Sequence, residues 1–475
     1  MSPEIAPNLL PPGGSASPRN ERPGGDKAGD AADRDLWIAA ELAKLSNADA
    51  DYWTFRRGVL RRGAHGFTQY PAMMVPPMQA ALLAVVLKVD GHIYSVLDPF
   101  CGAGTTLVEC MRLGLHYSGQ DVNPLAVLFC RAKAGPFHVR RLAAAADLVV
   151  ARAATDSSTR LEADFPGLAK WFMKRVAVEL SRLRRAIRRE NNQWCRRVLW
   201  VALAETVRLA SNSRTSTFKL HTRGADDLAT RSIQAIAIFR QLLSTIVVQL
   251  QHEATALRNT GHLTRGGCYR GDISLSLGDS ATHSPRAAAG AHDLLITSPP
   301  YGDNTSTVPY GQYSYLPLQW IDLCDIDESA TQAGFLASTY EIDSRSLGGS
   351  RKHVLQHLDQ LLLRAPTLAK TLSQLVDHPI DRRSRIAGFC RDLDACLGTS
   401  LHAIRRNAYM IWTVGNRRVG GLLVPTDMIL SELLQERGAR PVATIERRIP
   451  NKRMATRNNI ATTMRGESIL VLRKE

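Results

Sequence analysis

Apolar residues recur along the chain with two different spacings, and together these predict an α/β fold. Short apolar runs typical of buried strands lie at 94–98, 117–121, 273–277 and 293–297, and a helical spacing over 105–113 follows the first of them. The order strand, turn, helix, strand is typical of doubly wound sheets. We therefore predict a Rossmann-like sheet that carries helical insertions.

Two stretches keep a helical spacing for too long to belong to that sheet. Basic helical patterns run through 171–189, 194–209 and 228–257, which predicts a first helical insertion over 137–262. A second helical insertion is expected at 326–398. The parts left to form the sheet are 35–136, 263–325 and 399–475.

The end of the chain returns to strand patterns. We expect a strand at 408–414, a helix at 426–437, and strands at 441–449 and 468–472. The last two are interpreted as an antiparallel hairpin at an edge of the sheet.

The beginning of the chain has a different composition. Residues 1–34 are rich in Pro, Gly, Ala and Asp, which predicts a disordered tail. A short amphipathic helix is expected at 35–45. A further helix is expected over 78–89, with Pro76 and Pro77 in its first turn, where proline is tolerated.

The net charge of the chain indicates which kinds of molecule it can bind. The chain of 475 residues has a formal net charge of +16, which favours nucleic acid or an acidic membrane surface. It contains no apolar run long enough for a transmembrane helix and no secretory signal at its start, so we expect a cytoplasmic protein. The eight cysteines form no CxxC pair and no zinc-type cluster, so we expect reduced thiols and no metal.

A glycine turn follows the first strand, in the run Leu97-DPFCGAGT-Thr106. Glycines at such a turn let the backbone approach a ligand before a helix begins. The turn lacks the dinucleotide pattern G-x-G-x-x-G and the GK[ST] of a P-loop. Asp121, which closes the second strand, can accept hydrogen bonds from ribose hydroxyls or cap the next helix. Asp279, in a short Gly-Asp-Ser segment, suits a cofactor contact or an ordinary loop equally.

The most specific feature is Thr297-Ser-Pro-Pro-Tyr-Gly302 at the end of an apolar strand. Open α/β sheets place their sites at the carboxyl ends of strands. Ser298 and the carbonyl of Pro299 can accept hydrogen bonds from an NH₂ group, and Tyr301 can stack on a flipped base. We call residues 298–301 the tetrad.

The pair DPFCGAGTT and TSPPYGD resembles the DNA amino-methyltransferases, which modify cytosine N4 or adenine N6. The resemblance covers roughly 65–136 and 268–325, together with the terminal strands. It implies S-adenosylmethionine as cofactor and DNA as partner, and it leaves open whether a restriction or defence protein is a further partner. The cofactor-binding residues that it implies, including one in the segment that closes the cofactor pocket, are Tyr70, Asp98, Phe100, Gly102, Gly104, Thr105, Asp121 and Asp279. The implied catalytic residues are Ser298, Pro299, Pro300 and Tyr301.

Two departures from the family pattern carry information. The segment FTQYPAMMVP has Met73 where the family usually has lysine, so it supplies no cation to the cofactor. The tetrad begins with serine rather than Asp or Asn, which favours cytosine N4. The resemblance leaves open an adenine-N6 enzyme, an RNA guanine-N2 methyltransferase, and a DNA-binding protein without catalysis.

Basic residues in the first insertion are candidates for contact with DNA phosphates, which makes 137–262 the expected target-recognition region. The alternative is a solvated helix face. The candidates are Arg184, Arg185, Arg188 and Arg189 in one helical pattern, and Arg214 and Lys219 in a following loop.

Overall fold

The computed structural model describes residues 28–49, 51–55, 62–67, 69–285, 288–304, 307–349, 354–356, 358–449 and 466–475. Its centre is a seven-stranded sheet in the order β3-β2-β1-β4-β5-β9-β8. The strands are β1 (Ser95–Asp98), β2 (His116–Asp121), β3 (Ile273–Leu277), β4 (His292–Thr297), β5 (Ile404–Val414), β8 (Ala439–Arg448) and β9 (Gly466–Lys474).

The five strands from β3 to β5 in that order are parallel, and β9 runs antiparallel to both of its neighbours. The predicted Rossmann-like α/β sheet is therefore confirmed, and so is the C-terminal antiparallel hairpin. The hairpin does not lie wholly at the edge, because β9 is inserted between β5 and β8. Residues 450–465 lie outside the described ranges.

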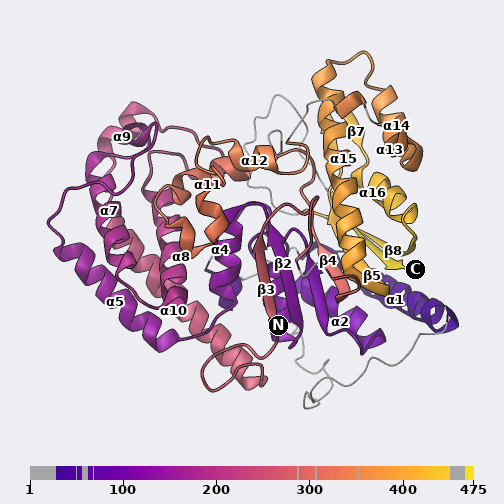
Figure 1. Cartoon of the computed structure of the whole chain (residues 1–475), viewed down its shortest axis with the longest axis horizontal. Helices are drawn as coiled ribbons and strands as arrows, with labels where there is room; N and C mark the ends of the chain where they lie inside the picture. The colour runs from indigo at the N-terminus through magenta and orange to yellow at the C-terminus, as the bar shows by residue number, and fades with distance from the viewer. Residues whose placement is uncertain are drawn as a thin grey trace.

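Helices cover both faces of this sheet (Figure 1). They are α1 (Ala28–Ala48), α2 (Pro76–Val89), α3 (Thr105–Arg112), α4 (Pro124–Lys133), α5 (Val139–Thr155), α6 (Leu168–Trp171), α7 (Lys174–Arg188), α8 (Gln193–Ala210), α9 (Ala225–Thr230), α10 (Ala235–Asn259), α11 (Tyr310–Leu318), α12 (Glu341–Arg345), α13 (Asp359–Arg364), α14 (Pro366–Ser373), α15 (Ile380–Ala403) and α16 (Thr426–Gln435). Short 3-10 helices are η1 (Tyr52–Thr54), η2 (Gly63–His65), η3 (Leu323–Asp325), η4 (Glu328–Thr331) and η5 (Val354–Gln356), and β6 (Arg417–Val419) pairs with β7 (Leu422–Val424) in a small hairpin.

Alternation along the strands gives the sheet two hydrophobic cores. Val96 of β1 packs in the core that α1 to α5 share with the first insertion. Its neighbour Leu97 packs in the opposite core, with α14, α15 and α16. Burial on both faces explains why these strands read as continuous apolar runs.

The structure corrects three predicted boundaries. Helix α1 begins at Ala28, so the end of the predicted tail is helical, and residues 1–27 lie outside the described ranges. An ion pair at Asp35 holds this helix in place. Asp35 is 6% exposed, and its carboxylate accepts a hydrogen bond from Arg473 Nε at 2.9 Å. The helical pattern at 171–189 is broken between α6 and α7, where the Trp171 carbonyl accepts a hydrogen bond from a distant loop.

The pattern at 228–257 is likewise divided into α9 and α10. Between them, Arg231 turns back and donates hydrogen bonds to the carbonyl of Leu209 in the last turn of α8 and to that of the capping residue Ser211, the latter at 2.6 Å. Such bonds satisfy carbonyl groups that a helix end leaves without partners. Within the described ranges, no helix combines the length and the apolar character that crossing a bilayer requires.

Candidate active site

One cavity lies at the carboxyl ends of the parallel strands. Adjacent placement of β2, β1 and β4 brings the glycine turn, Asp121 and the tetrad together, although they are far apart in the sequence. The predicted residues that line the cavity are Tyr70, Phe100, Gly102, Thr105, Asp121, Asp279, Ser298 and Pro300.

The two glycines of the turn have different surroundings. Both have positive φ angles, 49° at Gly102 and 74° at Gly104, which favour glycine. A Cβ atom at Gly102 would meet only the Tyr70 ring at 3.8 Å and a backbone oxygen at 4.0 Å. A Cβ atom at Gly104 would lie 2.9 Å from Cys130 Sγ. Gly102 therefore keeps the cavity open, whereas Gly104 faces α4 and is not among the lining residues, contrary to its expected place beside the cofactor.

Asp121 ties the glycine turn to the next helix. Its carboxylate accepts hydrogen bonds at 2.9 Å from the backbone N–H of Gly102 and at 2.9 Å from that of Asn123. Burial raises the pKa of Asp121 to about 6. Asn123 in turn caps α4 and donates from Nδ2 to the Tyr70 hydroxyl at 2.9 Å. This network fixes the cavity wall that a ribose would face.

Asp98 lies behind the cavity rather than in it. It is fully buried and accepts hydrogen bonds from the hydroxyl of Thr297 at 2.6 Å and the backbone N–H of Phe100 at 3.2 Å. Burial raises the pKa of Asp98 to about 6. The expected contact of Asp98 with a cofactor is therefore corrected: the carboxylate joins the end of β1 to the strand that carries the tetrad.

The tetrad is divided between the cavity and the C-terminal hairpin. Ser298 and Pro300 line the cavity, but Pro299 and Tyr301 do not. The Tyr301 hydroxyl donates to Glu467 Oε1 at 2.9 Å and accepts from the Ser298 hydroxyl at 3.4 Å. Burial raises the pKa of Tyr301 well above its usual value. The hydroxyl is thus held behind Ser298, while the side chain as a whole stays partly exposed.

Several lining residues were missed in the sequence. Tyr310 of α11 packs against Tyr70 with ring centroids 5.4 Å apart, and Asn304 follows the tetrad closely. Arg345 reaches the cavity from α12, inside the region interpreted as the second insertion. No short motif marks these residues, and only their proximity in space reveals them.

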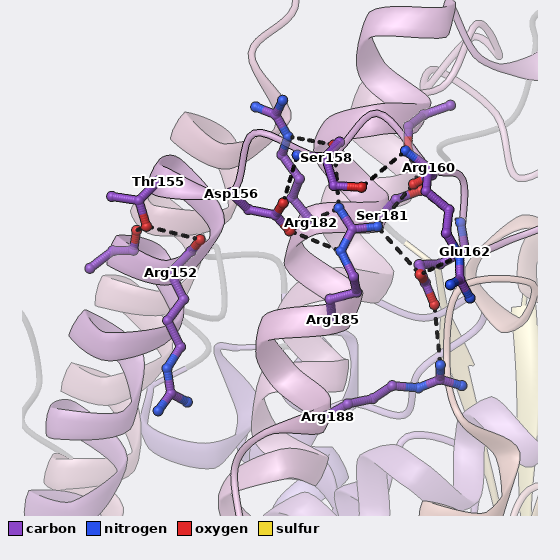
Figure 2. Close-up of polar contacts among 12 residues, drawn as sticks. Arg152, Thr155, Asp156, Ser158, Arg160, Glu162, Ser181, Arg182, Arg185 and Arg188 are labelled. Atoms are coloured by element: carbon purple, nitrogen blue, oxygen red, sulfur yellow. Dashed lines mark hydrogen bonds and ion pairs between the residues drawn. The ribbon is translucent and has the colours of Figure 1, made fainter.

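The arginines of α7 are engaged within the protein (Figure 2). Arg185 donates to Asp156 at 2.8 Å, and Arg188 pairs with Glu162 at 3.3 Å. Arg184 and Arg188 also pair with Asp322, at 2.9 and 2.6 Å. The predicted phosphate-facing stripe is therefore corrected for these three arginines, which fasten loops to the helix.

Arg189, Arg214 and Lys219 remain on the surface as exposed side chains. The loop that carries Arg214 and Lys219 packs against α11. Its Phe218 ring lies 5.8 Å from the Tyr313 ring, and Tyr313 is in turn 5.9 Å from Tyr70. This loop therefore adjoins the aromatic wall of the cavity.

Comparison with known proteins shows similarity to Type II methyltransferases. The chain is 28% identical over 459 residues to the Type II methyltransferase M.MvaI of Kocuria varians, and the match covers 93% of this chain and 98% of that protein. A match of 78 residues at 33% identity covers 16% of the chain and 14% of the Type II methyltransferase M.MjaII of Methanocaldococcus jannaschii. No family model matches the chain.

The similarity to M.MvaI runs along nearly the whole of both proteins, so it includes the sheet and both insertions. The sheet order and the shared cavity of the glycine turn and tetrad agree with the resemblance found in the motifs. The similarity to these Type II methyltransferases therefore supports the resemblance to the DNA amino-methyltransferases.

Proposed function

We propose that this protein is a site-specific DNA methyltransferase that transfers a methyl group from S-adenosylmethionine to cytosine N4 of a flipped base. The observation that supports this most directly is that Ser298 and the glycine turn open into one cavity. The cofactor and the target base can then lie next to each other within the same cavity. The serine at the head of the tetrad is the reason for choosing cytosine over adenine.

The cavity fits the cofactor that the family implies. Gly102 leaves its side of the turn open, where a Cβ would find only distant neighbours. Asp121 and Asp279 supply carboxylates for the hydroxyl and amino groups of a nucleoside, and Phe100 adds an apolar surface. When bound, S-adenosylmethionine supplies an activated methyl group on a positively charged sulfur.

The protein's part in the reaction is to prepare the amine. The lone pair of the cytosine amino nitrogen is delocalised into the ring, which makes the nitrogen a poor nucleophile. Hydrogen bonds donated by its two protons, one of them to Ser298 Oγ, favour a pyramidal nitrogen with its lone pair free. Because the Ser298 hydroxyl donates its own proton toward Tyr301, its lone pairs are available to accept. Positioning and fixed polar groups then account for most of the acceleration.

Contact with DNA is assigned to three exposed basic residues of the first insertion. Arg214 and Lys219 lie on the loop that packs against α11, and Arg189 is exposed at the end of α7. Such cations position a protein on the phosphate backbone without specifying sequence. The recognition of particular bases falls to other surfaces near the cavity.

The test is to incubate the purified protein with plasmid DNA and S-adenosylmethionine and to map the product by single-molecule sequencing, which reports the modified base and its context. We expect N4-methylcytosine in one sequence context. Ser298→Ala should lower turnover by the equivalent of about 2–4 kcal/mol, by analogy with the loss of one fixed hydrogen-bonding group from an oxyanion hole. Its cofactor affinity, measured by calorimetry, should stay near normal.

Ser373→Ala is the matched control, because that serine is exposed and bonds only within its own helix end. It should leave turnover unchanged. N6-methyladenine in the product would overturn the choice of base, and unmodified DNA or a fully active Ser298→Ala variant would overturn the catalytic assignment.

A further inference from the structure

Asn304 is a buried polar side chain that borders the cavity. It is 4% exposed and lies three residues beyond the tetrad. Among the described residues, no group donates a hydrogen bond to its side-chain oxygen. A buried acceptor left without a donor costs about 1–3 kcal/mol, so a partner for it is expected from outside the chain.

An ion pair fixes the turn that precedes Asn304. Asp303 is fully buried and pairs with Arg417 Nη1 at 2.8 Å. The guanidinium of Arg417 lies against Gly302, where a Cβ would be only 2.4 Å from Arg417 Cζ. Asn304 therefore gets its position from the ion pair of its neighbour, and its side-chain oxygen is left without a donor among the described residues.

The side-chain amide of asparagine can recognise a ligand that presents a hydrogen-bond donor next to an acceptor. A carboxamide offers an acceptor oxygen beside donor N–H groups. An exocyclic amine next to an unprotonated ring nitrogen offers the complementary pair, and asparagine reads adenine in DNA through this kind of match. Cytosine presents such an edge at N4 and N3. Ser298, which lines the same cavity, would approach the same amine.

We propose that Asn304 is a base-contacting residue that accepts a hydrogen bond from the exocyclic amine of the flipped target base. This inference rests on the proposed function and adds a residue outside the tetrad. It makes Asn304 a specificity determinant, because a base without that amine would leave the amide oxygen without a donor. Sites built in this way reject ligands that lack the hydrogen-bonding group.

The experiment uses the full-length protein and duplex DNA that carries its mapped site. Binding is measured with cytosine and with 2-pyrimidinone, which lacks the amine, at the target position. Wild type should prefer cytosine, and Asn304→Leu should lose that preference. We expect the leucine variant to reduce single-turnover methylation by about tenfold to a hundredfold.

Asn304→Asp keeps an acceptor oxygen and should retain the preference for the amine. Calorimetry with S-adenosylmethionine alone should give normal affinity for both variants, which also shows that they are folded. Weakened cofactor binding with the base preference intact would overturn the proposal and assign Asn304 to the cofactor. A leucine variant that methylates at the wild-type rate would also overturn it. Wild-type protein that modifies no DNA would overturn the proposed function itself.

Discussion

The ion pair between Arg417 and Asp303 gives a stability prediction whose size follows from burial. The side chains are 7% and 0% exposed, and the two atoms that pair are 2.8 Å apart. Arg417→Met keeps an unbranched side chain but removes the cation from a buried carboxylate. Breaking a buried pair by removing one partner costs about 3–5 kcal/mol, because the remaining charge has lost its compensation. We expect a loss of that size in the free energy of unfolding.

The assay is urea unfolding monitored by tryptophan fluorescence. The loss in the free energy of unfolding is calculated from the shift in the urea midpoint and from the slope. Arg385→Met is the matched control, because Arg385 pairs with Asp381 at a similar 2.7 Å but the side chains are 29% and 46% exposed. An exposed pair contributes about 0.2–1 kcal/mol. The double variant Arg417→Met/Asp303→Leu should recover part of the loss, because it buries no charge. Equal losses in the two single variants would refute the reasoning.

Three further predictions follow from single contacts. Gly104→Val should lower the free energy of unfolding in urea by about 1–3 kcal/mol, because φ is 74° and a sulfur atom lies 2.9 Å from the new Cβ. Gly91→Val, with nothing within 4 Å of its new Cβ, should leave the urea midpoint unchanged, and equal losses in the two variants would contradict this. Tyr301→Phe should lower stability in urea by about 1.5–3 kcal/mol, because its hydroxyl donates to the Glu467 carboxylate, and an unchanged midpoint would contradict this. Burial raises the pKa of Asp343 to about 7, so the folded state binds an extra proton and stability falls as pH rises from about 4 to about 7. Asp343→Asn should flatten that fall in melting temperature, and an unaltered profile would refute the assignment.

The sheet and the cavity could be predicted because their signals are local. Strand β4 is buried along its whole length, so its apolar run is continuous and ends directly at the tetrad. Parallel strands bring their carboxyl ends to one edge, which assembles motifs that are far apart in sequence. The strand pattern and the family resemblance together predicted Ser298, Gly102 and Asp121 as site residues, and all three line one cavity.

The parts that could not be predicted depend on partners distant in the sequence. The arginines of α7 form a dense basic run, and the sequence does not show that Arg188 meets Asp322, 134 positions away. In the same way, Asp98 belongs to the glycine-turn motif of the family. Its carboxylate accepts a hydrogen bond from the Thr297 hydroxyl, so it supports the site from behind and does not contact a ligand. Charge and motif identify candidate residues, whereas burial and pairing decide which of them a ligand can reach.

The position of β9 in the sheet has a consequence for folding during translation. This strand is the last of the seven to leave the ribosome, yet it lies between β5 and β8. Until it is made, β5 has an unpaired edge, the kind of surface that promotes aggregation. The same strand carries Glu467, which holds the hydroxyl of Tyr301. A nascent chain that stops short of this strand therefore has an unfinished tetrad as well as an open sheet, so assembly of the site depends on synthesis of the C-terminal hairpin.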